Sequence, residues 1–274
     1  MSKNRNWSIF NNTNNMMIDM SELGELKKFC GRLSDESGEI IRKHFRTKLS
    51  VESKSDQSPV TIADKKAEEK MRELIMKEFP SHGILGEEFG NHNENAEYIW
   101  VLDPIDGTKS FVCGTVTFGT LIALMKNDEP ILGVINQPIL KEFLIGDNST
   151  AELNGVIVKV RSCEKLSDAV LLSTDHLNIE EHQNKNGFDN LMRSVKYYRM
   201  WGDCYGYYLV ATGFADIMVD PIMNPWDLMA LIPVIRGAGG TITDYQGGDP
   251  VRGNSIVATG GKLHDEVIGI LNQR

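Results

Sequence analysis

The spacing of apolar residues in the first part of the chain predicts two amphipathic helices. From Ser21 onward, apolar side chains recur every three or four residues, which is the period of one helix face. This face comprises Leu23, Leu26, Phe29, Cys30, Leu33, Ile40 and Ile41. We expect Ser21, Glu22 and Glu25 to form a capped first turn.

A second helix is predicted after Thr61, because Thr61 and Asp64 have the spacing of a capping box. Its expected buried face comprises Ala67, Met71, Leu74, Ile75 and Phe79. Pro80 should end this helix, because proline cannot donate a helical hydrogen bond.

After Pro80 the pattern changes to short, continuous apolar runs, which are typical of strands buried on both faces. The predicted strands are residues 84–86, 98–102, 118–124, 131–136, 142–145, 156–160 and 169–172. The last third alternates between the two kinds of element. Helices are predicted at 205–212, 225–236 and 264–271, and strands at 216–219, 241–244 and 255–258.

Length and composition indicate one large globular domain. The chain has 274 residues, of which 41% are hydrophobic and 24% charged, so it can bury a sizeable core. Residues 1–20 are polar and rich in Asn, and we expect a flexible tail there. Residues 21–274 then form a single domain, with an N-terminal half of about 21–150 and a C-terminal half of about 151–274.

Charge and cysteine usage limit the possible partners. The formal net charge of −9 disfavours a nucleic-acid binder, because an acidic surface repels phosphate backbones. The four cysteines are scattered, which favours free thiols over disulfides or zinc. No apolar run reaches the roughly 18 residues of a membrane span. We therefore expect a cytoplasmic protein with no membrane contact.

Acidic residues follow the predicted buried elements. Glu87 and Glu88 come after one strand, Asp103 and Asp106 after the next, and Asp227 opens a helix. Ligands bind at strand ends in α/β sheets, and carboxylates gathered there repel one another unless cations neutralise them. Oxygen ligands favour Mg²⁺ or Mn²⁺ over zinc.

The segment Asp103-Pro104-Ile105-Asp106-Gly107-Thr108 adds an anion site to these carboxylates. Gly107 allows close backbone approach, and Thr108 can begin a helix whose amides bind phosphate. Each motif alone has a structural explanation, since Asp, Pro and Gly are common in turns. Their joint occurrence points to metal-assisted phosphoryl transfer.

Three motifs in order resemble the inositol monophosphatase family. They are Gly-Glu-Glu at residues 86–88, Trp-Val-Leu-Asp-Pro-Ile-Asp-Gly-Thr at 100–108 and Pro-Trp-Asp at 225–227. The resemblance runs from about Ser21 to the C-terminus. It implies an α+β fold, the layered αβαβα sandwich of the inositol monophosphatase and fructose-1,6-bisphosphatase type. It also implies a homodimer, two to three Mg²⁺ per active site with Mn²⁺ as a substitute, and inhibition by lithium.

The resemblance assigns the metal ligands residue by residue. Glu87, Asp103 and the main-chain carbonyl of Ile105 would hold the first metal. Asp103, Asp106 and Asp227 would hold the second, and Glu87 a weaker third.

The same resemblance assigns the catalytic and phosphate-binding groups. Asp64 and Thr108 correspond to the dyad that orients the attacking, metal-activated water, and Glu87 joins them as catalytic. The amides of Gly107 and Thr108 would receive the phosphate. No Ser, Cys or His nucleophile is required.

Two further segments resemble the histidinol-phosphate phosphatase branch of the family. One is Lys109-Ser110-Phe111 followed by residues 118–124, and the other is residues 198–207, with its Arg-x-x-Gly-Asp-Cys-Tyr signature. The implied substrate is a small phosphate monoester, L-histidinol phosphate, of the histidine biosynthesis pathway. Lys109 and Arg199 would then bind the substrate.

Asp203 and Asp220 are the candidates to face the cationic amine or imidazole of that substrate. Arg199 and Asp203 could instead form a local ion pair that supports the fold. The aromatic residues after Met200 could line an imidazole pocket or belong to the core or a dimer interface; they are Trp201, Tyr205, Tyr207 and Tyr208.

Two other functions stay open from the residues. One is a phosphatase for inositol-1-phosphate, or a broader sugar-phosphate or nucleotide phosphatase. The other is a regulatory binding protein on the same scaffold, since a fold does not determine function. The retention of every metal carboxylate argues against this last alternative.

Overall fold

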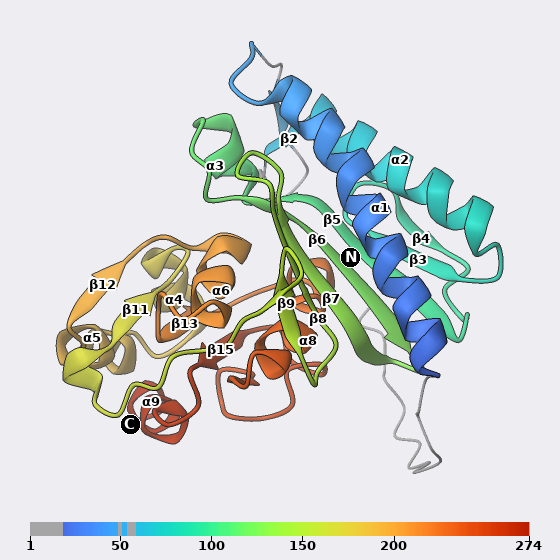
Figure 1. Ribbon diagram of the computed structural model, residues 1–274. Helices are drawn as coiled ribbons and strands as arrows, with labels where there is room; N and C mark the ends of the chain where they lie inside the picture. Colours follow the sequence, from blue (N-terminus) through green and yellow to red (C-terminus); the bar gives the residue numbers. More distant parts are fainter. Residues whose placement is uncertain (1–18, 49–50, 54–58, 274) are drawn as a thin grey trace.

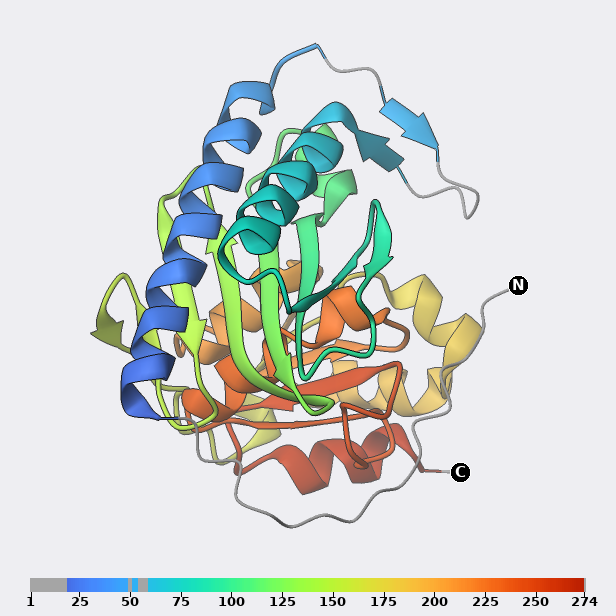
Figure 2. The ribbon, with the colours of Figure 1, turned by 90° about the vertical axis from the view of Figure 1, so that its right-hand side faces the viewer.

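The computed structural model describes residues 19–48, 51–53 and 59–273. The first layer of the fold is a pair of helices. Helices α1 (Met20–His44) and α2 (Ile62–Glu78) lie side by side across one face of a large sheet (Figures 1 and 2). Asp19 caps α1 by accepting the Ser21 amide at 3.2 Å, so the cap lies two residues before the predicted Ser21. The predicted tail comprises residues 1–20. Residues 1–18 lie outside the described part of the chain, and Asp19 and Met20 belong to the cap and the start of α1.

The capping box predicted for the second helix is confirmed. The Thr61 amide donates to Asp64 Oδ2 at 2.9 Å, and the Thr61 hydroxyl accepts the Ala63 amide at 3.1 Å. Helix α2 ends at Glu78, two residues before Pro80. The strand β2 (Pro59–Thr61) leads into it and pairs antiparallel with β1 (Val51–Ser53).

The large sheet has eight strands. In spatial order they are β10 (Val156–Ile157), β9 (Ala151–Leu153), β8 (Glu142–Gly146), β7 (Glu129–Gln137), β6 (Gly119–Lys126), β5 (Tyr98–Asp106), β3 (Gly83–Gly86) and β4 (Gly90–His92). Neighbours are antiparallel except β3 and β5, which are parallel. The predicted two-sided burial is clearest in β6, where every residue but the last is buried.

The second sheet has five strands and is also mixed. Its spatial order is β12 (Tyr197–Arg199), β11 (Val170–Leu172), β13 (Ile217–Asp220), β15 (Ile256–Thr259) and β14 (Thr241–Thr243). Strand β11 runs parallel to β12 and to β13, whereas the pairs that include β15 are antiparallel.

The remaining helices complete the layers. Helices α6 (Asp203–Ala211), α7 (Pro225–Leu228) and α8 (Leu231–Gly237) lie between the sheets, where they contact strands of the large sheet. Helices α4 (His176–His182), α5 (Lys185–Ser194) and α9 (His264–Leu271) cover the outer face of the second sheet (Figure 1). Two short helices remain, α3 (Thr108–Val112) and a 3₁₀ helix, Leu166–Asp168. The predicted αβαβα sandwich is therefore confirmed.

Three predicted elements were wrong in extent. The strand predicted at 156–160 comprises only Val156–Ile157. The strand predicted to end at Leu102 continues to Asp106, with a register shift between Asp103 and Asp106 against β6. The predicted helix 225–236 is divided into α7 and α8, although the backbone at Met229 and Ala230 stays in the right-handed helical region. Pro233 explains the division, because it has no N–H to donate to the Met229 carbonyl.

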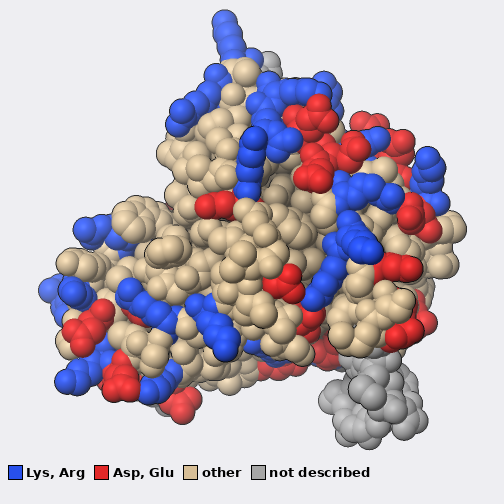
Figure 3. Space-filling view, viewed as in Figure 1, with Lys and Arg blue, Asp and Glu red and all other residues tan. Residues whose placement is uncertain are grey.

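The surface is mixed in charge. On the face seen in Figure 3, Lys and Arg alternate with Asp and Glu over the helices, and much of the centre is uncharged. Among the described residues, none of the helices combines the length and the apolar character needed to cross a membrane.

Candidate active site

Three carboxylates from the two halves of the chain converge at one edge of the large sheet. Asp103 and Asp106 come from β5, and Asp227 comes from α7, which packs on β5 and β6. Each offers one oxygen, and these three oxygens all lie within 4.8 Å of one another. Asp103 is only 2% exposed, whereas Asp106 and Asp227 are half-buried.

Local backbone structure explains how each carboxylate is oriented. The register shift in β5 interrupts the strict alternation of sides between Asp103 and Asp106. Asp227 stands at the third position of α7, where its Oδ2 accepts the Asn224 amide at 2.8 Å. The Asp106 carboxylate accepts the amide of Cys204, at the start of α6.

The charges of this cluster are not balanced by basic side chains. Burial raises the pKa of Asp103 well above its ordinary value, and repulsion by Glu87, Asp106 and Asp227 raises it further. Burial also raises the pKa of Asp106, and it raises that of Asp227 to about 6. Within the described part of the chain, no Lys or Arg forms an ion pair with Asp103, Asp106 or Asp227. An all-oxygen cluster of this kind fits a hard divalent cation such as Mg²⁺.

Glu87 lies at the same edge of the sheet but outside the group of three oxygens. It follows β3, the parallel neighbour of β5, and its amide donates to the Leu102 carbonyl at 3.1 Å. Its charge contributes to the raised pKa values of Asp103, Asp227 and Asp64, so its carboxylate is near all three.

Asp64 and Thr108 are brought together, as expected. The Thr108 hydroxyl donates to the Ile105 carbonyl at 3.0 Å and lies 3.4 Å from Asp64 Oδ1, which is its alternative acceptor. Asp64 is fully buried, and its other oxygen accepts from the Thr61 amide and hydroxyl. Burial raises the pKa of Asp64 despite these hydrogen bonds.

The turn between β5 and α3 touches the C-terminal half. Gly107 has a φ of 84°, in the left-handed region that favours glycine. A Cβ atom at this position would lie 2.8 Å from Asp203 Oδ2, so Gly107 also makes room for that carboxylate. Helix α3 has no side-chain cap at its start.

Asp203 joins the two halves. It opens α6 with a φ of 50°; its amide donates to Thr174 Oγ1 at 2.8 Å, and its carboxylate accepts from Ser110 Oγ at 3.2 Å. Burial and the charge of Asp220 raise the pKa of Asp203 to about 7, while Lys109 has the opposite effect. Asp203 therefore lies between the cluster of Asp103, Asp106 and Asp227 and the second sheet.

Asp220 and Arg199 lie differently from Asp203. Asp220 is 5% exposed and accepts from Tyr207 Oη at 2.9 Å and from the Thr174 amide at 3.2 Å. The Arg199 guanidinium is exposed and donates to the Tyr198 carbonyl at 2.7 Å. The described ion pairs do not include Arg199 with Asp203, so the alternative of a local Arg199–Asp203 pair is not realised.

The aromatic residues of this region do not form one pocket. Tyr207 is fully buried in the core between the sheets. Tyr205 and Tyr208 stack with ring centroids 5.0 Å apart, and Trp201 is half exposed. Trp201 is thus the aromatic side chain of this group that a ligand could reach most easily.

Several positioning residues escaped the sequence analysis. Thr174 binds both Asp203 and Asp220, and Ser110 binds Asp203. Thr174 could have been found by the reasoning applied to Asp103, since it follows a predicted strand. Ser110 was noted only as part of the Lys109-Ser110-Phe111 resemblance, and its contact with Asp203 could not be foreseen because Asp203 is 93 residues away in the chain.

Comparison with known proteins identifies the family. The model of the inositol monophosphatase family matches residues 22–274. The chain therefore belongs to the inositol monophosphatase family. It is a phosphatase of that family, whose members are metal-dependent, and the Asp103, Asp106 and Asp227 cluster could hold the metal ion.

Named relatives lie in several branches of the inositol monophosphatase family. The chain is 50% identical over 231 residues to "Bifunctional phosphatase IMPL2, chloroplastic" of Arabidopsis thaliana, covering 83% of this chain and 66% of that protein. It is 40% identical over 217 residues to a histidinol-phosphatase of Chlorobaculum parvum, covering 78% and 84%. A solved inositol monophosphatase from Zymomonas mobilis is 35% identical with a TM-score of 0.82, covering 91% and 98%.

Proposed function

We propose that this protein is a Mg²⁺-dependent phosphatase that hydrolyses L-histidinol phosphate to L-histidinol and phosphate in histidine biosynthesis. The observation that carries the proposal is the Asp203 carboxylate, which lies against Gly107 at the end of the metal-binding strand. An acidic group there suits a substrate with a cationic amine and an imidazole. The relative named histidinol-phosphatase supports this branch.

We assign two to three Mg²⁺ ions, or Mn²⁺ as a substitute, to the carboxylate cluster. Glu87, Asp103 and the Ile105 carbonyl would hold the first ion, and Asp103, Asp106 and Asp227 the second. Glu87 would hold a weaker third. When bound, such ions activate a water molecule and neutralise the departing oxygen.

The chain's own groups then orient the reactants. With the Ile105 carbonyl turned to a metal, the Thr108 hydroxyl would donate to Asp64 Oδ1 instead, and its lone pairs would be free to accept a hydrogen bond from the attacking water. The Thr61 cap holds Asp64 in place for this role. The amides of Gly107 and Thr108 would bind the phosphate oxygens, at a helix start that no side chain caps.

The substrate's cationic end would face Asp203. The pKa of Asp203 is raised to about 7, and a nearby cation would favour the charged form of its carboxylate. The contact between Asp203 and the substrate's cation would then be stronger. Asp220 would add a second negative charge near this end of the substrate, and its oxygens accept hydrogen bonds from Tyr207 and Thr174. Lys109 and Arg199 remain the proposed basic contacts, and Arg199 would have to exchange its Tyr198 partner to reach a ligand.

The second candidate function is hydrolysis of inositol-1-phosphate or another sugar or nucleotide phosphate, which the Zymomonas inositol monophosphatase supports. A regulatory binding protein is less favoured, because every proposed metal carboxylate is present. A homodimer and lithium sensitivity are further predictions. The cytoplasmic location also stays a prediction, and the Arabidopsis relative is named chloroplastic.

The test compares phosphate release with Mg²⁺ from L-histidinol phosphate, myo-inositol-1-phosphate and an adenosine bisphosphate. We expect kcat/KM to favour histidinol phosphate by about a hundredfold, or about 2.7 kcal/mol. The Asp203→Asn variant should raise KM for histidinol phosphate more than for the neutral inositol ester. Comparable rates on all three would favour the second candidate, and no release from any would favour a binding protein.

A further inference from the structure

Helix α2 carries a buried carboxylate that has no part in the site described so far. Glu68 is fully buried and lies four residues after Asp64, which places both carboxylates on the same helix face. Asp64 faces the turn that holds Thr108. Glu68 faces a different segment, the turn between β3 and β4 that begins with Glu87.

The Glu68 carboxylate binds the two backbone amides that directly follow Glu87. Oε2 accepts the Glu88 amide at 2.7 Å, and Oε1 accepts the Phe89 amide at 3.2 Å. Hydrogen bonds from backbone amides to an ionised carboxylate are among the stronger kind in proteins. One buried side chain therefore holds the start of this turn.

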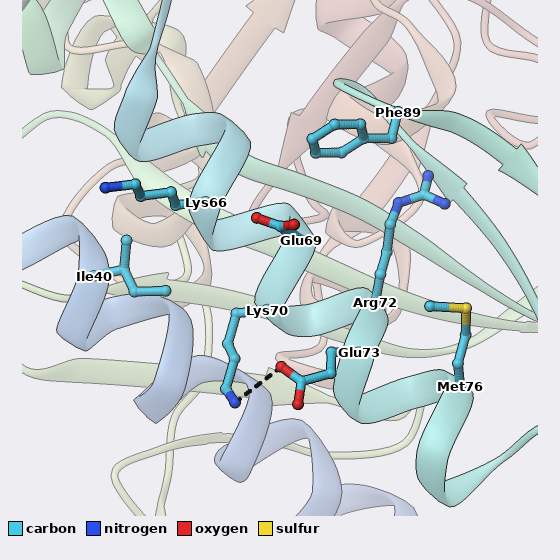
Figure 4. Close-up of a pocket in the computed structure, with 8 residues that line it drawn as sticks. All are labelled: Ile40, Lys66, Glu69, Lys70, Arg72, Glu73, Met76 and Phe89. Carbon is cyan, nitrogen blue, oxygen red and sulfur yellow. Dashed lines mark hydrogen bonds and ion pairs between the residues drawn. The ribbon is translucent and has the colours of Figure 1, made fainter.

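Arg72 completes the attachment from the next turn of α2. Its Nε donates to Glu68 Oε1 at 2.7 Å, and another guanidinium nitrogen donates to the Gly90 carbonyl. The guanidinium also lies 6.0 Å from the centre of the Phe89 ring, and Figure 4 shows it extending from α2 toward this ring. Glu68 and Arg72 together hold residues 88–90 against α2.

The chain is held equally well on the other side of Glu87. A Cβ atom at Gly86 would lie 1.9 Å from Glu68 Oε1, so only glycine lets the carboxylate approach so closely. The Glu87 amide itself donates to the Leu102 carbonyl of β5. The backbone of Glu87 thus has fixed neighbours before, at and after its own position.

We propose that Glu68 is a positioning residue that holds the Glu87 carboxylate toward Asp103 and Asp227. This inference rests on the proposed function, in which Glu87 is a metal ligand. Outer-shell partners of metal ligands typically change metal affinity or activity about 10- to 100-fold when they are replaced. Glu68 therefore tunes metal binding without touching the metal or the substrate.

The decisive variant is Glu68→Gln, which has the same shape but only one oxygen acceptor for the two amides and Arg72. We expect the Mg²⁺ concentration for half-maximal activity to rise about tenfold or more. KM for the phosphate ester at saturating Mg²⁺ should stay unchanged. Calorimetric titration with Mn²⁺, without substrate, should show the same loss of affinity.

Two further variants separate positioning from general stability. Glu69 is the exposed neighbour of Glu68 on α2, and its side chain lines a surface hollow of about 820 Å³ (Figure 4). The control variant Glu69→Gln should therefore behave as wild type. Arg72→Gln leaves both amide bonds to Glu68 but removes the guanidinium that holds Glu68 Oε1, so it should weaken metal binding measurably, though less than Glu68→Gln does. If Glu68→Gln loses its cooperative thermal transition, Arg72→Gln decides, and wild-type metal affinity in it would overturn the proposal.

The outcomes also distinguish this inference from the proposed function. A wild-type protein that releases no phosphate with Mg²⁺ would defeat the proposed function. An active wild type with unchanged Mn²⁺ affinity in Glu68→Gln would defeat only the role of Glu68. A lower kcat with unchanged metal affinity would likewise make Glu68 a structural residue.

Discussion

Buried carboxylates in the two sheets of this protein have opposite surroundings. At the edge of the large sheet, Asp103 faces Glu87, Asp106 and Asp227, and their charges add to the effect of burial on its pKa. In the second sheet, Asp216 is 1% exposed, but Arg161 Nε donates to its Oδ1 at 2.6 Å. The Val170 amide donates to its other oxygen at 2.6 Å.

This difference distinguishes a ligand-binding site from a structural ion pair. A buried charge that is paired within the chain has its desolvation cost offset by its partner, and removing that partner is costly because the remaining charge is left uncompensated. Carboxylates that face one another without a cation destabilise the protein on its own and gain stability only from a ligand. The same residue type thus indicates a binding site in one sheet and a structural tie in the other.

Replacing Asp103 should have the largest effect on activity. Asp103→Asn removes the ligand shared by both proposed metals, so we expect kcat/KM to fall by well over 100-fold, beyond the usual cost of outer-shell changes. The metal-free variant should melt at a higher temperature than metal-free wild type, because repulsion is reduced. Steady-state kinetics and thermal melts in a chelator check both parts; substantial remaining activity would contradict the metal assignment.

Replacing Asp216 should have the reverse effect. Asp216→Asn removes the buried partner of Arg161, and because the Arg161 side chain is 39% exposed and screened by water, we expect the free energy of unfolding to fall by about 1 to 2 kcal/mol. The folded variant should keep its metal dependence. Denaturant unfolding measures the loss, and Asp168→Asn, an exposed neighbour, serves as the control. Equal stability of both variants would mean that the pair contributes little.

The pH dependence of the metal-free protein should show the smallest effect. The pKa of Asp227 is raised to about 6, above the roughly 3.9 of an unfolded aspartate. The folded state therefore binds more protons, and stability falls as pH rises from about 4 to 7. Added Mg²⁺ should restore stability at pH 7.

Histidines require a matched control in this experiment. Burial lowers the pKa values of His82 and His264, which makes stability rise with pH over part of the same range. The measured quantity is therefore the difference in melting temperature between wild type and Asp227→Asn, both without metal. A difference that does not change with pH would contradict the raised pKa of Asp227.

Local sequence signals predicted the elements best where neighbours in the chain decide the structure. The capping box of Thr61 and Asp64 and the closing helix His264–Leu271 agree with the structure. The elements α4, α5 and β12 were not predicted. In α5 the signal was present but missed, because Phe188, Leu191 and Met192 recur at the i, i+3 and i+4 spacing of a helix face. The division of the helix predicted at 225–236 could have been foreseen, because Pro233 stands in the interior of that helix and cannot donate to the Met229 carbonyl.

For the site, the sequence by itself determined which residues are chemically suited, because the carboxylates stand in short motifs with recognisable turns. Only the tertiary structure decided how they meet. Asp203 reaches Gly107 from the other half of the chain, Arg199 turns to Tyr198, and Glu68 holds the amides after Glu87. The contacts of Asp203 and of Glu68 join segments about 20 to 100 residues apart, and the packing of α2 and α6 against the large sheet brings these segments together.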